Sequence, residues 1–266
     1  NAPCPGDSAT VDVVVNPLPN AGLNSMLELC SNDLATVDLF DSLDGTPEIG
    51  GTWSPALTSG TGVYDPSLDT PGIYTYTLIG ITPCPNVSSD VNVIVIQEPD
   101  AGTNATVNIC DNDGTIDLFN NLGGTPDVGG TWSPSLNSGT NIFDPLIDAV
   151  GTYTYTVTGT SPCADASSTV TISVSPFLNA GSDGSVIACT ADGTIDLFDS
   201  LGGTPEVGGT WSPALNSGTG IFDPLIDAED TYTYTTTGTG PCSNDTATVE
   251  VTIEISPDAG LDNTLN

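Results

Sequence analysis

The 266-residue sequence contains no lysine, arginine or histidine, whereas it contains 34 aspartate and glutamate residues, which gives a formal net charge of −34. Because no side chain can replace the counterions around phosphates, binding of nucleic acid through its backbone is excluded. Direct binding to an anionic membrane surface is disfavoured as well, because the chain has no basic side chains. The commonest general base, cationic oxyanion stabilisers and phosphate clamps are also missing, so we expect no enzyme and no catalytic residues.

Long apolar runs are missing as well. No stretch approaches the ~18–20 consecutive apolar residues of a membrane-spanning helix, so we expect no direct membrane insertion. Acidic chains are often disordered, but 37% of these residues are hydrophobic, and they alternate with threonine and serine in strand-like runs. We therefore expect a folded, almost wholly β protein.

Tryptophan is scarce, and its three copies mark an internal repeat. The motif GGTWSP recurs with a period of 79 residues and supplies Trp53, Trp132 and Trp211. It is followed in each copy by a tyrosine-rich run and a proline-cysteine pair, in GIYTYTLIGITPC, GTYTYTVTGTSPC and DTYTYTTTGTGPC. Each copy then closes with a strand-like segment such as STVTISVSP.

The repeats also predict where the domains begin and end. The first residues, NAPCPGDSATVDVVVNP, match the end of a repeat, and the last, SPDAGLDNTLN, match the start of one. We therefore expect a segment of a longer array. The predicted parts are the end of a preceding repeat (1–18), three full repeats (19–97, 98–176 and 177–256) and the start of a following repeat (257–266).

Each repeat contains six candidate strands, punctuated by glycine, proline, asparagine and aspartate. In the second repeat they are 105–109, 115–119, 130–133, 141–143, 152–158 and 168–174. This pattern predicts an all-β fold of tandem immunoglobulin-like antiparallel β-sandwiches. The short linkers NPLPNAG, QEPDAG and SPFLNAG contain proline, which stiffens the connection and favours an extended rod.

The three tryptophans have two interpretations. The lone tryptophan of each repeat is the natural core anchor of an immunoglobulin-like sandwich, and we expect Trp53, Trp132 and Trp211 to be buried. The alternative is a stacking platform for carbohydrate, which would place each tryptophan in an exposed, shallow groove.

Seven cysteines recur at two places per repeat, which indicates disulfides formed in an oxidising, extracellular compartment. A structural zinc site is disfavoured, because the sequence has neither histidine nor a Cys-x-x-Cys pair.

The cysteine connectivity stays open between two patterns. Pairing within repeats gives Cys30–Cys84, Cys110–Cys163 and Cys189–Cys242, with Cys4 bonded to an upstream repeat. In an immunoglobulin topology, however, Cys110 lies at the far pole of its repeat and Cys163 at the near pole, beyond the ~7 Å that a disulfide spans between Cα atoms. The other pattern joins successive repeats through Cys30–Cys163 and Cys110–Cys242.

Acidic turns are candidates for calcium, a hard cation that prefers oxygen ligands. The segment CDNDGTIDLF places Asp111, Asp113 and Asp117 around a glycine-containing turn, at the spacing of a short calcium loop but without the bidentate glutamate. The equivalent residues in the other repeats are Asp192 and Asp196, and Asp33 and Asp38. The alternative is an ordinary Asx turn between two strands, which we favour slightly. No other cofactor is expected.

A second acidic pattern begins with the aspartate of the motif DP in each repeat and includes a second aspartate four residues later. It consists of Asp65 and Asp69, Asp144 and Asp148, and Asp223 and Asp227. Here too we expect turn formation instead of metal binding.

Several of these motifs together resemble a known family. The DAG or NAG start, the cysteine before TIDLF, GGTWSP and GTYTYTVTG followed by PC are similar to tandem immunoglobulin/PKD-like repeats of large Bacteroidota surface proteins, including gliding-motility adhesins exported by the type IX system. The resemblance implies a secreted stalk or filament on a bacterial cell surface. It also implies O-glycans on Asp-Ser/Thr-apolar triplets, found here at Ser8, Ser42, Ser200 and Thr246.

These observations lead to one functional hypothesis and two alternatives. The favoured hypothesis is a structural stalk or filament segment of a secreted bacterial adhesin that supports attachment or gliding. The alternatives are a glycan-binding repeat module and a subunit of a self-assembling extracellular fibre. The expected partners are neighbouring repeats of the same long chain, other copies in a fibre, and a surface or glycan ligand.

Overall fold

The computed structural model describes residues 4–60, 62–139, 141–255 and 257. The predicted start of a following repeat, 257–266, therefore lies outside the described residues except for Pro257. The chain divides into two compact units, with the second repeat shared between them. Each repeat is accordingly described by itself, and the rod-like arrangement stays a prediction.

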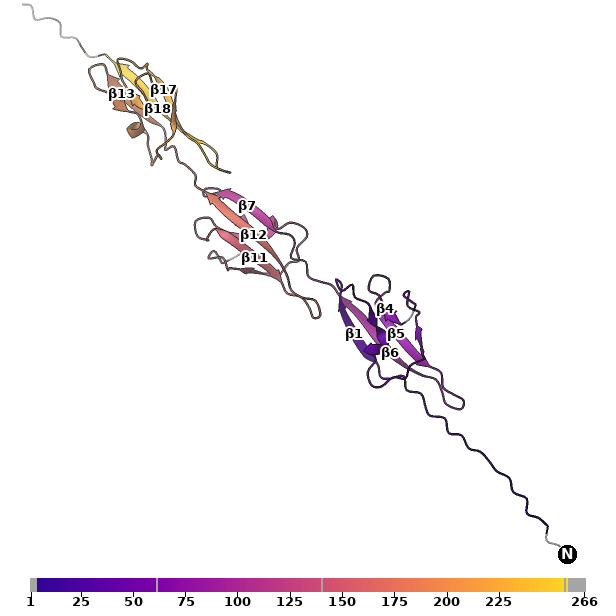
Figure 1. The fold of residues 1–266 in the computed structure, drawn as a ribbon. Helices are drawn as coiled ribbons and strands as arrows, with labels where there is room; N and C mark the ends of the chain where they lie inside the picture. The colour runs from indigo at the N-terminus through magenta and orange to yellow at the C-terminus, as the bar shows by residue number, and fades with distance from the viewer. Residues whose placement is uncertain (1–3, 61, 140, 256, 258–266) are drawn as a thin grey trace, which may run out of the picture. The chain divides into compact units, whose positions relative to one another are not determined.

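Each repeat contains six strands and one short helical turn, in the same order (Figure 1). Repeat 1 contains β1 (Ser25–Cys30), β2 (Val37–Asp38), α1 (Leu39–Ser42), β3 (Thr52–Ser54), β4 (Val63–Tyr64), β5 (Gly72–Leu78) and β6 (Val87–Ile96). Repeat 2 contains β7 (Ala105–Cys110), β8 (Ile116–Asp117), η1 (Phe119–Asn121), β9 (Thr131–Ser133), β10 (Ile142–Phe143), β11 (Gly151–Val157) and β12 (Ala166–Ser175). Repeat 3 contains β13 (Gly184–Cys189), β14 (Ile195–Asp196), η2 (Phe198–Ser200), β15 (Thr210–Ser212), β16 (Ile221–Phe222), β17 (Asp230–Thr236) and β18 (Asp245–Glu254).

All six strands predicted for the second repeat are present, but the second of them is shorter than expected. The predicted strand 115–119 pairs only through Ile116 and Asp117, which lie opposite Phe143 and Ile142. The chain then turns into η1, because the Asp117 carboxylate accepts the backbone N–H of Phe119 at 2.9 Å. The aspartate that suggested a metal ligand thus ends the strand.

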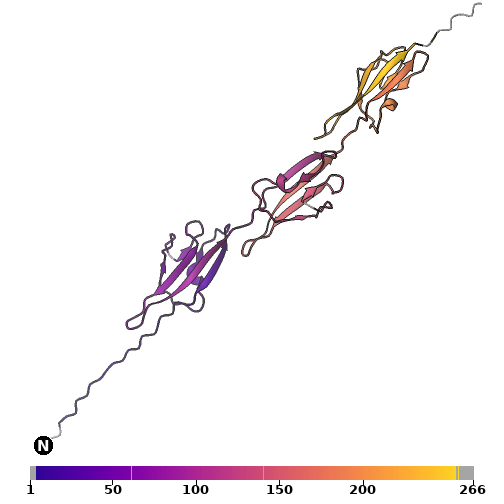
Figure 2. The ribbon, with the colours of Figure 1, turned by 180° about the vertical axis from the view of Figure 1, so that it is seen from behind.

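The strands of each repeat form a four-stranded sheet and a two-stranded ribbon. Figures 1 and 2 show the main sheet of each repeat from opposite sides. The sheet orders are β1-β6-β5-β3, β7-β12-β11-β9 and β13-β18-β17-β15, and the ribbons are β2–β4, β8–β10 and β14–β16. The fold is thus an all-β, immunoglobulin-like sandwich. One pairing in each repeat departs from the antiparallel expectation: β1 runs parallel to β6, β7 to β12 and β13 to β18, with Cys30 opposite Ile96 in repeat 1. The parallel pairing arises because the chain crosses to the ribbon after β1, and does not return along β1 as a hairpin.

The core of each repeat lies between sheet and ribbon. In repeat 1 the alternating residues Tyr74, Tyr76 and Leu78 of β5 point inward and are at least 93% buried. The ribbon closes over them through Tyr64, whose ring meets that of Tyr74 edge-on at 5.9 Å between centroids. Equivalent edge-on pairs occur at Phe143–Tyr153 and Phe222–Tyr232. No helix in the described residues is long and apolar enough to cross a membrane.

A buried carboxylate organises the loop after each ribbon. Asp148 is buried and accepts backbone N–H groups from Asn137, Ser138 and Asp144 at 2.5, 3.2 and 2.9 Å. Burial by itself would raise the pKa of this carboxyl, but the hydrogen bonds from Asp144, Ser138 and Asn137 outweigh it and hold the pKa below its ordinary value. Asp69 and Asp227 are buried and bonded in the same way, so the predicted role in turn formation is confirmed.

This depressed pKa predicts acid sensitivity. A carboxylate whose pKa is lower in the folded than in the unfolded chain stabilises the fold at pH values above ~4, and this stabilisation is lost as the pH falls through the folded value. We expect Asp148→Asn to lower the melting temperature at pH 7 and to reduce the further loss of stability on acidification.

The measurement is a set of melting curves between pH 7 and pH 2.5, with Asp41→Asn as the control because Asp41 is exposed. The stabilising role is wrong if Asp148→Asn and Asp41→Asn give the same dependence of melting temperature on pH.

Candidate functional site at the ends of the repeats

The first cysteine of each repeat lies at the end of the first strand, where an aspartate fixes the turn. Cys30 ends β1, and its backbone N–H donates to the Asp33 carboxylate at 3.0 Å. The backbone N–H of Asp33 donates in return to the carbonyl oxygen of Cys30 at 2.9 Å. The same exchange joins Cys110 to Asp113 and Cys189 to Asp192. The motif Cys-x-x-Asp therefore presents the cysteine on a tight, hydrogen-bonded turn.

The second cysteine lies on a loop before the closing strand, and in repeat 2 this residue is Cys163. Its backbone N–H donates to the carbonyl of Thr160 at 2.9 Å, and the N–H of Gly159 donates to the Asp165 carboxylate at 2.9 Å. A Cβ atom at Gly159 would lie 2.4 Å from the carbonyl oxygen of Ala164, so glycine is required for the loop to close. The loop therefore holds the cysteine in a defined position.

Two disulfides join the cysteines of successive repeats. Cys30 bonds to Cys163 and Cys110 bonds to Cys242, with Cα atoms 5.0 and 5.1 Å apart. The within-repeat pattern is wrong for all three repeats, because Cys163 and Cys242 each bond to a cysteine of the preceding repeat. The junction pattern, left open by the sequence, is the observed one.

The physical reason is the length of the closing strand. Cys30 lies opposite Ile96, the last residue of β6, whereas Cys84 precedes Val87, its first residue. Ten residues of strand at about 3.3 Å each place the two ends roughly 30 Å apart. A disulfide within the repeat would need to span that distance, far beyond its reach of about 7 Å between Cα atoms.

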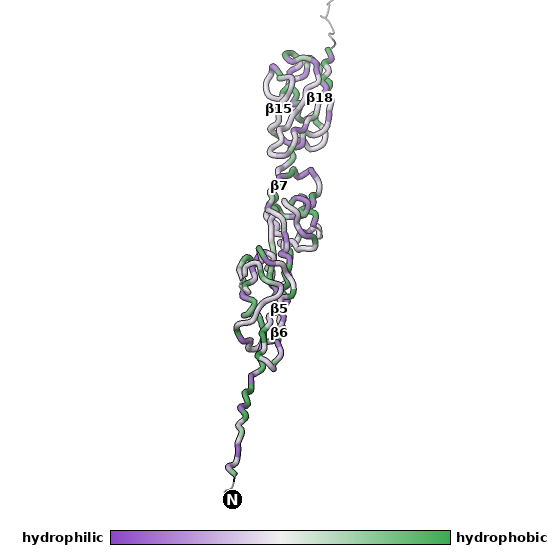
Figure 3. Tube along the Cα trace, turned by 90° about the vertical axis from the view of Figure 1, so that its right-hand side faces the viewer, coloured by the Kyte–Doolittle hydropathy of each residue, from purple (hydrophilic) through white to green (hydrophobic). Residues whose placement is uncertain are grey.

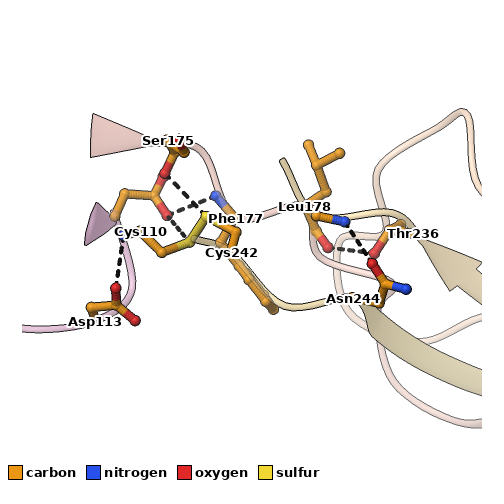
Figure 4. The surroundings of a disulfide bond; sticks show 10 residues. Cys110, Asp113, Ser175, Phe177, Leu178, Thr236, Cys242 and Asn244 are labelled. Atoms are coloured by element: carbon orange, nitrogen blue, oxygen red, sulfur yellow. Dashed lines mark hydrogen bonds between the residues drawn. A yellow bond between two sulfur atoms is a disulfide. The ribbon is translucent and has the colours of Figure 1, made fainter. Parts of the chain in front are cut away.

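Figure 4 shows the surroundings of the Cys110–Cys242 disulfide. The Sγ atom of Cys242 lies 3.4 Å from the carbonyl oxygen of Ser175, the last residue of β12. The Asp111 carboxylate accepts the backbone N–H of Phe177 at 2.8 Å, and the Thr236 hydroxyl donates to the carbonyl of Leu178 at 2.5 Å. The linker after β12 is thus held by hydrogen bonds as well as by the disulfide.

Cys84 lies in the same surroundings as Cys163 and Cys242. Its Sγ atom is 3.5 Å from the carbonyl oxygen of Asn16, and its backbone N–H donates to Ile81 at 2.8 Å. The side chain is a half-buried thiol, whereas that of Cys4 is an exposed thiol. The pairing of Cys4 with an upstream repeat stays a prediction.

The acidic residues predicted to bind calcium form backbone caps. Asp33, Asp113 and Asp192 accept the N–H of the turn cysteines. Asp38, Asp117 and Asp196 accept the N–H of the second residue after them, which is phenylalanine in each repeat. Within the described residues, no three acidic or cysteine side chains come together in a group that could hold a metal ion. Calcium binding at these turns therefore stays a prediction.

The residues predicted to carry glycans differ in exposure. Ser8 and Thr246 are exposed, whereas Ser42 and Ser200 are half-buried. Glycosylation at all four stays a prediction, and the two exposed hydroxyl groups are the accessible ones.

The three tryptophans are half-buried instead of buried as expected, but Trp53 and Trp211 do pack against the cores of their repeats. Trp53 lies on β3, an edge strand of the sheet, and contacts the Tyr76 ring at 5.1 Å between centroids, with the two rings tilted by 46°. An edge strand has a neighbouring strand on one side only. The Trp53 side chain also borders a hollow of about 550 Å³, which Phe40 and Leu57 help to line. Trp211 borders a smaller hollow, of about 260 Å³, in repeat 3.

The observed connectivity predicts the chemistry of a cysteine variant. We expect Cys110→Ser to expose one additional thiol, that of Cys242, while Cys30 and Cys163 stay bonded. Alkylation under denaturing conditions, followed by digestion at acidic residues and mass mapping, measures this; trypsin has no site in the chain. Alkylation of Cys163 in this variant would restore the within-repeat assignment.

Comparison with known proteins gives structural neighbours only. No protein-family model and no curated protein matches the sequence. A titin I-band fragment, I67–I69, superposes with a TM-score of 0.41 at 14% identity, covering 87% of this chain and 97% of the fragment. Extracellular domains 3–5 of Drosophila OTK give a TM-score of 0.32 at 13% identity, covering 90% and 100%. The four N-terminal Ig domains of a Dscam1 isoform give a TM-score of 0.30 at 11% identity, covering 91% of this chain and 74% of that one.

Proposed function

We propose that this chain is a structural segment of an extracellular adhesion-type protein, in which disulfides between successive repeats keep the array connected under tension. The observation that carries the proposal is the pairing of Cys30 with Cys163 and of Cys110 with Cys242. Disulfides persist in oxidising, extracellular compartments, which supports the proposed location. The absence of any cationic side chain argues against catalysis and nucleic-acid binding.

The two disulfides overlap along the sequence, and this gives the chain two covalent routes. One route follows the backbone from Cys30 to Cys110 and crosses to Cys242. The other crosses from Cys30 to Cys163 and follows the backbone to Cys242. A pulling force is therefore shared between two backbone segments, so neither can extend fully without the other. A tether that must not lengthen under load benefits from this arrangement.

The overlap predicts a short maximum extension. The shortest covalent path omits about 132 residues, which at about 3.4 Å per residue removes roughly 450 Å from the fully stretched chain. We expect single-molecule pulling from the two termini to show this shorter contour length in oxidised protein and the full length after reduction.

The control is the double variant Cys30→Ser with Cys110→Ser, which should have the full length in both conditions. Equal contour lengths for oxidised and reduced wild-type protein would refute the tether function.

The finer parts of the proposal rest on the sequence. Resemblance to tandem repeats of Bacteroidota surface proteins supports a stalk or filament of a secreted bacterial adhesin with a role in attachment or gliding. The proposed partners are neighbouring repeats of the same array, with other copies of the chain in a fibre as an alternative. Calcium at the acidic turns and glycans at Ser8, Ser42, Ser200 and Thr246 belong to the same proposal.

The hollow beside Trp53 favours glycan binding as a second candidate function. A half-buried indole that borders a hollow resembles the platforms on which sugar rings stack, and the hollow of about 550 Å³ accommodates one or two sugar units. Asp38 lies at its rim, although one of its carboxylate oxygens already accepts the N–H of Phe40. Repeat 3 has a related hollow, so binding would be multivalent.

Glycan binding predicts that tryptophan fluorescence changes on titration with oligosaccharides. In the double variant Trp53→Phe/Trp211→Phe, most of this change should be lost. The matched control is Trp132→Phe alone, which leaves both hollows intact. If millimolar concentrations of a panel of oligosaccharides leave the wild-type spectrum unchanged, this second function is excluded for that panel.

A further inference from the structure

The segment before the first repeat has the sequence of a closing strand. Residues 7–16, DSATVDVVVN, correspond position by position to 245–254, DTATVEVTIE, in β18. In β18 the inward residues Val249 and Val251 are 0% and 1% exposed. Their counterparts Val11 and Val13 are 83% and 80% exposed, and residues 7–16 belong to no described strand. The alternating colours of this segment near the N-terminus are visible in Figure 3.

A closing strand in this fold has two neighbours, and one of them always ends in cysteine. The first strand runs parallel to it, so that Cys30 lies opposite Ile96 and Cys110 lies opposite Ser175. Asn16 is the position in the N-terminal segment that corresponds to Ile96 and Ser175. A first strand paired with this segment would therefore place its cysteine opposite Asn16.

Cys84 is positioned to receive that cysteine. Its Sγ atom lies 3.5 Å from the carbonyl oxygen of Asn16, as Cys163 Sγ lies 3.3 Å from that of Ile96. The Asn16 side chain also donates to the carbonyl of Thr82 at 3.3 Å and so fixes the end of the segment against this loop. Cys163 in the equivalent place is bonded to a first-strand cysteine, whereas Cys84 is a thiol.

We propose that residues 11–16 and Cys84 together form a docking site for the first strand of another repeat of this kind. The incoming strand runs parallel to 11–16, in the register that β7 has with β12. Its first and third residues then lie beside Val11 and Val13 on the same face of the sheet, as Ala105 and Val107 lie beside Val170 and Ile172, and its terminal cysteine forms a disulfide with Cys84. The occupant is a strand of the type ATVNIC, followed by the Cys-x-x-Asp turn. The proposal rests on the structural role proposed above and names the partner of the loop cysteine in repeat 1.

The bond requires removal of two protons and two electrons from the two thiols. A disulfide oxidant accepts both electrons and both protons and becomes a dithiol. In a test, the partner cysteine can be supplied as its mixed disulfide with 2-nitro-5-thiobenzoate. The Cys84 thiolate then attacks the Sγ atom of the partner, and the aromatic thiolate leaves, so no further oxidant is needed.

The probe is a synthetic peptide of residues 105–113, ATVNICDND, activated in this way and added to the intact, folded chain. We expect it to modify Cys84 at least tenfold faster than Cys4, after each rate is divided by that for the small reagent 5,5′-dithiobis(2-nitrobenzoate). Mass mapping after digestion at acidic residues assigns the adducts. Cys4 is a suitable internal reference because it is an exposed thiol in the same chain.

Two controls separate strand docking from simple thiol reactivity. A peptide with serine in place of the valine and isoleucine of VNIC should lose the preference for Cys84. In the chain, Val11→Ser with Val13→Ser should lose it as well, and these exposed positions leave the folded repeats intact. An equal normalised rate at Cys84 and Cys4, or a preference unchanged in either control, overturns the proposal. The pulling experiment depends on the other two disulfides, so the two proposals fail independently.

Discussion

The position of the closing strand determines how this molecule is held together. The strand pairs on both sides and runs from one pole of its repeat to the other, with one cysteine of the repeat beside its end and the other before its start. In a simple chain-entropy estimate, a loop of roughly 55 residues closed within a repeat contributes about 4 kcal/mol, and one of about 133 residues contributes about 5 kcal/mol. The difference is small, so entropy does not select the pairing. The length of the strand selects it.

The charge imposes a second constraint, because no carboxylate in this chain can be neutralised by a side-chain cation. The buried carboxylates Asp69, Asp148 and Asp227 are instead satisfied by backbone N–H groups. Such bonds favour the ionised form and fix the loop at the same time. At the surface, Asp33 and Asp113 also accept backbone N–H groups and so fix the cysteine turns. Acidic residues thus act as local structural elements in a chain that has no ion pairs between side chains.

Much of the fold could be predicted because the local signals are strong. Alternation in TYTYTVT fixed the inward residues Tyr153, Tyr155 and Val157, all of which are buried. The parallel pairing of β1 with β6 was not predictable from alternation, which is the same for parallel and antiparallel neighbours. The burial of tryptophan was overestimated, since a sequence does not reveal that GTWS forms an edge strand. The spacing of the predicted calcium residues did not reveal their structural role, in which Asp113 and Asp117 cap different backbone groups.

The cysteines show why the strand topology carries more information about disulfide pairing than the spacing along the sequence. Within one repeat, Cys110 and Cys163 look like an ordinary disulfide pair, and nothing in the local sequence contradicts that pairing. Only the topology separates them, and the topology follows from the first strand lying beside the last. Once that pairing is given, the first-strand cysteine of one repeat lies next to the loop cysteine of the following repeat, as the two disulfides show.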